Sequence, residues 1–115
     1  MKISALKKNS DFLRIYRRGK SAAGAAVVCY VLPNRTGDVR LGLTSSKKIG
    51  GAVQRNRARR VMRAAFREVA PLVRPGVDIV LVARVKTVTV KSTALLPSLT
   101  AGLGKLGALQ SIENR

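Results

Sequence analysis

The sequence contains no histidine and only five acidic residues, against 23 lysines and arginines. General acid and base catalysis usually draws on histidine or on positioned carboxylates, and a two-metal nuclease site needs several carboxylates that converge. Here the acidic residues are widely separated along the chain: Asp11, Asp38, Glu68, Asp78 and Glu113. The composition therefore argues strongly against an enzyme that hydrolyses its substrate unaided, and it indicates neither a catalytic residue nor a protein metal site.

Cysteine and long apolar runs are also scarce. Cys29 is the only cysteine of the sequence, so it can form neither an internal disulfide nor a cysteine-based metal site, and we expect it in the core. The longest apolar stretch, residues 22–32, is far too short to span a bilayer, and residues 1–8 lack the apolar region of a signal peptide. We therefore expect a cytoplasmic protein with no membrane partner.

Aromatic residues are few: two phenylalanines, two tyrosines and no tryptophan. Phe12 and Tyr16 lie four positions apart and share one face of a predicted helix. That helix is expected to have Asn9 or Ser10 as its N-cap and to end at Gly19. Spacing alone favours two side chains that anchor the helix to the core. The other interpretation is a platform on which unpaired bases stack.

What the chain has in abundance is positive charge. Its formal net charge is +18 and its pI is about 11.8. Such a balance points first to nucleic acid as the partner and second to anionic membranes. The whole chain, residues 1–115, is the length of one domain, which would bury roughly 65% of the surface of the unfolded chain.

The charge is concentrated in residues 47–67, which hold eight basic residues and no acidic one. Helical periodicity over residues 53–70 predicts one apolar face, made of Ala58, Val61, Met62, Ala65, Phe66 and Val69. The opposite face carries Asn56 and an arginine ridge that consists of Arg59, Arg60, Arg63 and Arg67. Like charges at this spacing repel, so the ridge is better tolerated when an anion such as a polyphosphate covers it. A face that serves solubility alone would carry both signs of charge.

Two strands are expected before the basic segment. Residues 21–32 begin with small side chains and continue with β-branched and other apolar ones, whose alternate positions would face opposite sides of a strand. Residues 39–45 form the second strand and follow a turn rich in Pro, Asn, Gly and Asp. We expect these strands to pair as an antiparallel hairpin. Gly42 would leave one face of the second strand flat, where a ligand could lie next to Tyr30.

The remainder of the chain predicts one strand and one helix. Residues 77–83 are almost continuously apolar and read as a central strand, which the basic helix joins to the previous strand as a crossover. Residues 84–91 are expected to be a loop or a frayed extension of this strand. Spaced leucines predict a C-terminal helix with Pro97 in its first turn, and residues from about 110 onwards are expected to be disordered.

The run at residues 47–63, KKIGGAVQRNRARRVMR, closely resembles the signature of the protein component of bacterial ribonuclease P. The preceding GLTSS at residues 42–46 and the early Ser10-Asp11-Phe12 are similar to that family as well. The likeness extends over residues 6–84. It implies an α+β fold, a two-layer α/β sandwich ordered α-β-β-β-α-β-α and similar to the second domain of a ribosomal protein, with a left-handed βαβ crossover.

The resemblance also implies a reaction and its partners. Family members help a large catalytic RNA remove the 5′ leader of precursor tRNA hydrolytically, and the RNA and substrate hold the Mg²⁺ ions. Ribonuclease P RNA and precursor tRNA are thus the expected partners, with no obligate protein partner. The runner-up interpretation is a structural ribosomal or other RNA-binding protein without a role in catalysis.

Residue roles follow from the same resemblance. The residues expected to contact the catalytic RNA are Lys47, Lys48, Arg55, Asn56, Arg57, Arg59, Arg60 and Arg63, and Arg67 extends the ridge on helical geometry alone. Those expected to line a cleft for the single-stranded leader are Phe12, Tyr16 and Tyr30. With this implication, base stacking becomes the preferred interpretation of Phe12 and Tyr16, in place of anchoring the helix to the core. The leucine-rich C-terminal segment departs from the more charged end that is common in the family.

Overall fold

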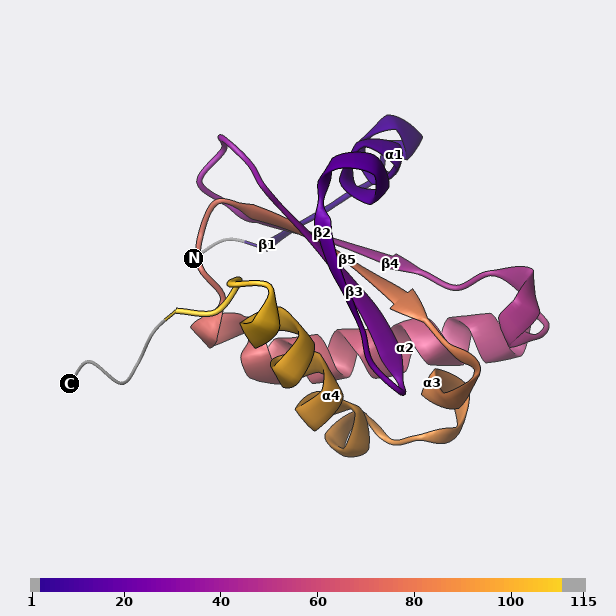
Figure 1. Cartoon of the computed structure of the whole chain (residues 1–115). Coiled ribbons are helices and arrows are strands. Elements are labelled where there is room, and N and C mark those ends of the chain that lie inside the picture. The colour runs from indigo at the N-terminus through magenta and orange to yellow at the C-terminus, as the bar shows by residue number, and fades with distance from the viewer. Residues whose placement is uncertain (1–2, 111–115) are drawn as a thin grey trace.

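A computed structural model describes residues 3–110 and contains one mixed sheet with helices on both of its faces (Figure 1). The strands are β1 (Ile3–Ala5), β2 (Lys20–Ala23), β3 (Val27–Pro33), β4 (Val39–Thr44) and β5 (Val77–Ala83). The helices are α1 (Asn9–Arg18), α2 (Ala52–Val69), α3 (Val85–Thr89) and α4 (Ser92–Lys105), and 3₁₀ turns lie at Lys47–Ile49 and Ala70–Leu72. The predicted α+β class is confirmed, and the order of the predicted elements is retained.

The strand order across the sheet is β1-β4-β5-β3-β2. As predicted, β5 is central and almost fully buried, and the α2 crossover joins it in parallel to β4. The predicted hairpin is wrong, because β5 lies between β3 and β4 and pairs with both. The turn residues at 33–38 do reverse the chain, as predicted. The position between β3 and β4 is nevertheless taken by β5, which is buried along almost its whole length.

The sequence patterns missed β1, which pairs in parallel with the first half of β4. Its three residues are too few to show the alternation of apolar and polar side chains that identifies a strand. They nevertheless form one edge of the sheet, and β2 forms the other.

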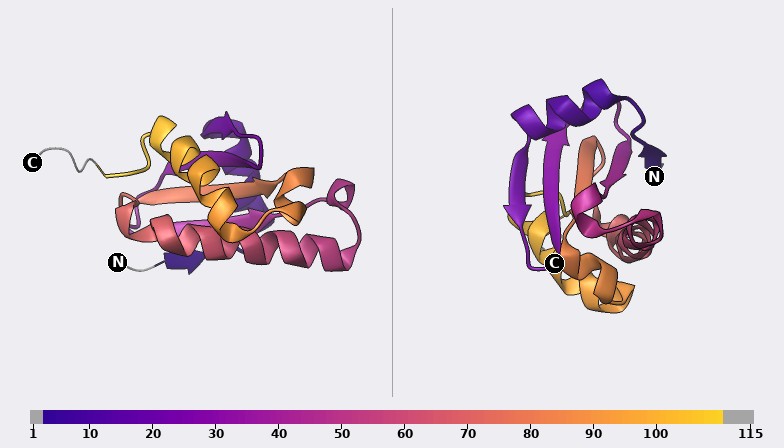
Figure 2. Two further views of the ribbon diagram at one scale, coloured as in Figure 1. Left: turned by 90° about the horizontal axis from the view of Figure 1, so that it is seen from below. Right: turned by 90° about the vertical axis from the view of Figure 1, so that its right-hand side faces the viewer.

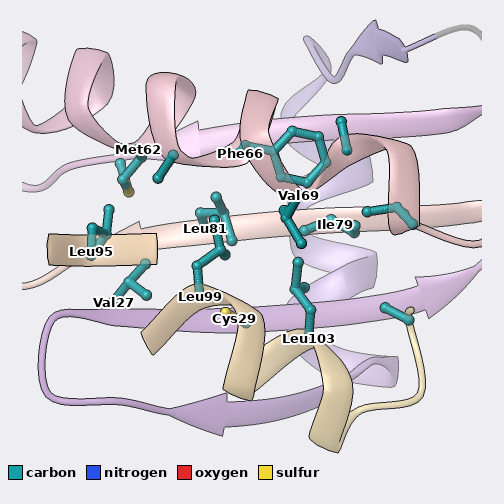
Figure 3. Packing of buried hydrophobic residues seen from close by; sticks show 14 of the residues in the cluster. Val27, Cys29, Met62, Phe66, Val69, Ile79, Leu81, Leu95, Leu99 and Leu103 are labelled. Atoms are coloured by element: carbon teal, nitrogen blue, oxygen red, sulfur yellow. The ribbon is translucent and has the colours of Figure 1, made fainter. Parts of the chain in front are cut away.

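Helices α2 and α4 pack side by side on one face of the sheet, whereas α1 lies on the opposite face (Figures 1 and 2). The main core lies under α2 and α4, and Figure 3 shows its larger side chains. Met62, Phe66 and Val69 of α2 meet spaced leucines of α4 and buried residues of β3 and β5. Cys29 belongs to this core as predicted, and burial raises the pKa of its thiol to about 12. The predicted apolar face of α2 is confirmed.

A smaller core lies under α1. Ile15 and Leu6 pack with Val80, and the aromatic rings of Phe12 and Tyr30 cover them. The two faces of the sheet are therefore both protected, by α2 and α4 on one side and by α1 on the other.

Helix boundaries required three corrections. The N-cap of α1 is Lys8 and no side chain caps the helix, so Asn9 and Ser10 lie within its first turn. The expected loop after β5 contains the short helix α3. Pro97 lies in the second turn of α4, where its exposed position lets water reach the carbonyl group of Thr93 that lacks a helical donor.

The C-terminal end gives a further correction. Gln110 was expected to be disordered, but its backbone N–H donates to the carbonyl of Leu72 at 2.7 Å, and its side chain donates to Val73. The rest of that prediction concerns residues 111–115, which lie outside the described residues.

Gly19 follows α1 as predicted, but for a reason other than conformational freedom. Its φ of −79° is open to any residue. A Cβ atom there would lie 2.6 Å from the carbonyl oxygen of Ile15 and 2.9 Å from that of Val31. Glycine is needed because two backbone oxygens approach this closely.

Within residues 3–110, no helix is both long enough and apolar enough to cross a membrane.

Candidate nucleic-acid interface

The loop before α2 fixes where the basic helix begins. Gly50 adopts a φ of +141°, a conformation that favours glycine, and Gly51 is the N-cap of α2. Lys47 and Lys48 are exposed in the 3₁₀ turn just before it. With no acidic residue in the first turn of α2, the positive end of the helix dipole adds to these two ammonium charges.

Several predicted RNA-contact residues near this end are held by hydrogen bonds. Arg55 donates to the carbonyl of Gly50 at 3.1 Å, and the Oγ of Ser45 donates to the carbonyl of Arg55 at 3.2 Å. Arg59 donates to Ser45 Oγ at 2.8 Å and to the side-chain oxygen of Asn56. The side chains of Asn56 and Arg59 are therefore positioned together, which leaves the remaining guanidinium N–H groups of Arg59 oriented for a ligand.

Arg57 takes a different direction from the ridge. Its Nε donates to the carbonyl of Val88 at 2.8 Å and so fastens α2 to α3. The structure therefore gives Arg57 a structural contact in addition to the role that the resemblance implied.

The other three arginines of the ridge, Arg60, Arg63 and Arg67, are exposed. They make no hydrogen bond from their side chains and no ion pair with any residue in the described part of the chain. Their charges are uncompensated on one helix face, as the periodicity predicted. Such a face is suited to bind phosphates, because each guanidinium can donate two parallel hydrogen bonds.

On the opposite face of the sheet, the three predicted cleft residues lie together. The ring centroids of Phe12 and Tyr16 are 6.5 Å apart, and those of Tyr16 and Tyr30 are 5.0 Å apart with the rings edge to face. Tyr16 is 37% exposed, and the other two rings are half-buried. We call Phe12, Tyr16 and Tyr30 the aromatic cluster. Partial exposure leaves ring surface on which bases can stack.

The flat surface expected at Gly42 is not free. A Cβ atom at Gly42 would lie 2.5 Å from the ring of Phe12, so this ring covers the glycine. The expectation of a ligand on Gly42 beside Tyr30 is therefore wrong. The missing side chain of Gly42 instead lets the ring of Phe12 pack directly on β4.

Sequence reasoning missed a buried ion cluster around Asp78 on the α1 side. This carboxylate is fully buried and accepts hydrogen bonds from Arg40, Arg14 and Asn34. Burial alone would raise the pKa of Asp78, but the hydrogen bonds from Arg40 and Asn34 and the arginine charges outweigh it and lower the pKa. The sequence did carry one signal for this cluster. Asp78 is a single charged residue within the apolar strand of residues 77–83, and a buried charge needs a partner.

Within residues 3–110, no three of His, Cys, Asp and Glu gather closely enough to hold a metal ion.

The comparisons with known proteins agree with this geometry. The model of the family described as Ribonuclease P matches residues 1–107. The chain belongs to the ribonuclease P protein family. This membership makes it a component of the ribonuclease P ribonucleoprotein, with a role in processing the 5′ ends of tRNA.

Relatives share both sequence and fold with the chain. The ribonuclease P protein component of Clostridioides difficile strain 630 is 45% identical over 83 residues, 71% of this chain and 73% of that protein. The component from Thermoanaerobacter sp. strain X514 is 44% identical over 87 residues, 76% and 75% of the two chains. Among solved structures, the ribonuclease P protein of Staphylococcus aureus superposes with a TM-score of 0.82 at 33% identity, covering 95% of this chain and 100% of that one. The protein from Thermotoga maritima gives 0.75 at 30% identity, covering 90% and 94%.

Proposed function

We propose that this subunit of ribonuclease P binds the catalytic RNA through α2 and the 5′ leader of precursor tRNA through the aromatic cluster, and thereby assists Mg²⁺-dependent removal of the leader. The observation that carries the proposal is a division of surfaces. Unpaired guanidinium groups occupy α2 on one side of the sheet, and the partly exposed rings lie between α1 and the sheet on the other.

The RNA contact follows from the chemistry of the ridge. Arg60, Arg63 and Arg67 lie within two helical turns and present planar donor groups at the spacing of successive turns. Phosphates would take the place of the solvent and ions around them, and the release of counterions would drive binding. Lys47 and Lys48 extend the same charge beyond the start of the helix.

The leader contact follows from the rings. An unpaired base stacked on an exposed tyrosine contributes about 1 to 3 kcal/mol, and any base can do so. Such a contact suits a leader of variable sequence. Base pairing would remove it, so the aromatic cluster would distinguish single-stranded leader from the folded tRNA body.

The chemistry of hydrolysis is assigned to the RNA. We place the Mg²⁺ ions on the catalytic RNA and its substrate, where they would activate the attacking water. The protein would contribute position and positive charge: its +18 offsets phosphate repulsion between the two RNAs and so permits cleavage at lower Mg²⁺.

The test is cleavage of a precursor tRNA at low Mg²⁺ by the protein alone, by a bacterial ribonuclease P RNA alone and by both together. We expect only the mixture to cut, at the mature 5′ end. Cutting by the protein alone would place catalytic groups in the chain. A mixture that gains nothing over the RNA would favour a structural RNA-binding protein.

A further inference from the structure

A pocket of about 420 Å³ opens at the edge of the sheet, where β1 ends and β4 continues. Its walls are apolar and come from the β1 segment, β4, α1 and α2, with Leu6, Phe12, Leu43 and Phe66 among the lining residues. Three arginines of the ridge, Arg59, Arg63 and Arg67, also line it. We call it the edge pocket. Its lining contains no acidic side chain.

The backbone of β4 adds two polar groups to this pocket. The N–H of Leu6 donates to the carbonyl of Leu41 at 2.9 Å, which shows that the backbone groups of Leu41 point towards β1. In a strand the pattern repeats every second residue, so the N–H and C=O of Leu43 point the same way. The pairing with β1 stops at Leu41. Leu43 therefore offers one donor and one acceptor that no strand in the described chain uses.

These features together match the parts of one nucleotide. The half-buried side chains of Leu41 and Leu43 form an apolar surface for a base, and the donor and acceptor of Leu43 can bind the polar edge of that base. The guanidiniums of Arg63 and Arg67, which have no partner among the described residues, are available for its phosphate. A purely apolar ligand would use neither the backbone pair nor the arginines.

We propose that the edge pocket binds one unpaired nucleotide of the ribonuclease P RNA, extruded from its helices. This inference rests on the proposed function of α2, because three of the four arginines of the ridge also line the pocket. A base held there would let the protein recognise one particular unpaired position of the RNA, which phosphate contacts alone cannot do. The leader is assigned to the aromatic cluster, in which Tyr16 and Tyr30 do not line the edge pocket and Phe12 borders both sites.

The experiment fills the pocket without changing charge. Ala5 is exposed, lines the pocket and ends β1, so Ala5→Trp would occupy the space of the base. Ala23→Trp is the matched control, because Ala23 is the exposed last residue of the other edge strand. Ile3→Trp fills the same pocket from a second position and replaces Ala5→Trp if that variant does not fold.

The assembled holoenzyme with bound precursor tRNA is probed with dimethyl sulfate and a carbodiimide, which together report the base edges of all four nucleotides. We expect one unpaired nucleotide of the ribonuclease P RNA to be protected by the wild type and by Ala23→Trp, and exposed with Ala5→Trp. RNA affinity should fall about tenfold with Ala5→Trp, with an unchanged salt dependence.

Three outcomes would contradict this inference in distinguishable ways. Identical protection with the wild type and Ala5→Trp would overturn the edge pocket while leaving the role of the ridge intact. A pocket-dependent protection in the precursor tRNA would assign the pocket to the substrate and overturn the choice of RNA. Absence of any binding by the wild type would refute the proposed function itself.

Discussion

The carboxylate of Asp78 accepts two hydrogen bonds of 2.7 Å from the guanidinium of Arg40, one on each oxygen. These residues are direct neighbours in the register of β5 and β4. Arg14 of α1 reaches the same carboxylate at 3.0 Å, and Asn34 reaches it at 2.7 Å. One buried charge thus joins the central strand, its parallel neighbour, the helix that covers them and the loop after β3.

Replacing Asp78 by Asn should therefore destabilise the fold. Two partly exposed arginines would lose the fully buried anion that they share, and we expect the free energy of unfolding to fall by about 2 to 4 kcal/mol. Urea denaturation measures the change. Asp38→Asn is the control, because its carboxylate makes no ion pair with another described residue, and it should change stability far less. Equal effects of the two substitutions would contradict the role of the cluster.

The same cluster predicts how stability depends on pH. The pKa of Asp78 in the folded state lies below the ordinary value of 3.8. The stabilisation from its charge is thus fully present well above pH 3.8 and is lost as the pH falls through the folded-state pKa. The difference in unfolding free energy between the wild type and Asp78→Asn should be constant near neutral pH and shrink in strong acid. A difference that grows on acidification would refute this assignment.

The ridge predicts a change in salt dependence. Arg60→Ala with Arg63→Ala should weaken binding to ribonuclease P RNA and reduce the slope of log affinity against log salt by about 1.5, because two phosphate contacts are lost. Filter binding at several salt concentrations measures both. Arg35→Ala with Lys105→Ala removes the same charge from exposed positions on other segments, and its slope should remain near that of the wild type.

The aromatic cluster predicts a loss that depends on the substrate. Phe12→Ala with Tyr16→Ala should lower the affinity of the holoenzyme for leader-containing precursor tRNA by about tenfold or more, since up to two stacking contacts are removed. Binding of the protein to the catalytic RNA should fall less, because the arginine ridge of α2 lies on the opposite face of the sheet and only Phe12 of the two rings also lines the edge pocket. An equal loss on leaderless tRNA would show that the cluster does not contact the leader.

Two glycines predict contrasting effects of one added methyl group. Gly19→Ala would meet backbone oxygens, which cannot move away, and should cost about 2 kcal/mol or more of stability. Gly42→Ala would meet the ring of Phe12 and, at 3.3 Å, the Cδ1 atom of Leu6, which belong to side chains and not to the backbone. We expect Gly42→Ala to fold with a small loss of stability and to weaken leader binding. Thermal unfolding and precursor-tRNA binding separate the two effects.

Sequence patterns predicted the parts of the fold that depend on local period. The buried face of α2, the central β5 and the leucine face of α4 each repeat over several turns or positions, so the core side chains were identifiable. The resemblance to the family predicted that Phe12, Tyr16 and Tyr30 lie in one cleft, and their rings do lie together. Their role in binding the leader remains a prediction.

The misses arose where the partner of a segment lies far away in sequence. Turn residues indicate that a chain reverses, but they do not show that β5 will come between β3 and β4. The three residues of β1 have no pattern without the edge of β4. Asp78 was counted as an isolated acid because Arg14 and Arg40 lie 64 and 38 positions away. Each of these depends on tertiary pairing, which a single sequence does not display.

The late position of β5 has a consequence for synthesis on the ribosome. Until residues 77–83 emerge, the native neighbours available among the described strands are β2 for β3 and β1 for β4. Two-stranded pieces of this kind are marginally stable in water. The nascent chain thus carries two unfinished strand edges while all of α2 is already translated, and those edges can pair with other chains. When β5 leaves the ribosome, it pairs with both of these edges. A translational pause just before residue 77 would therefore prolong the stage at which the nascent chain is most prone to aggregate.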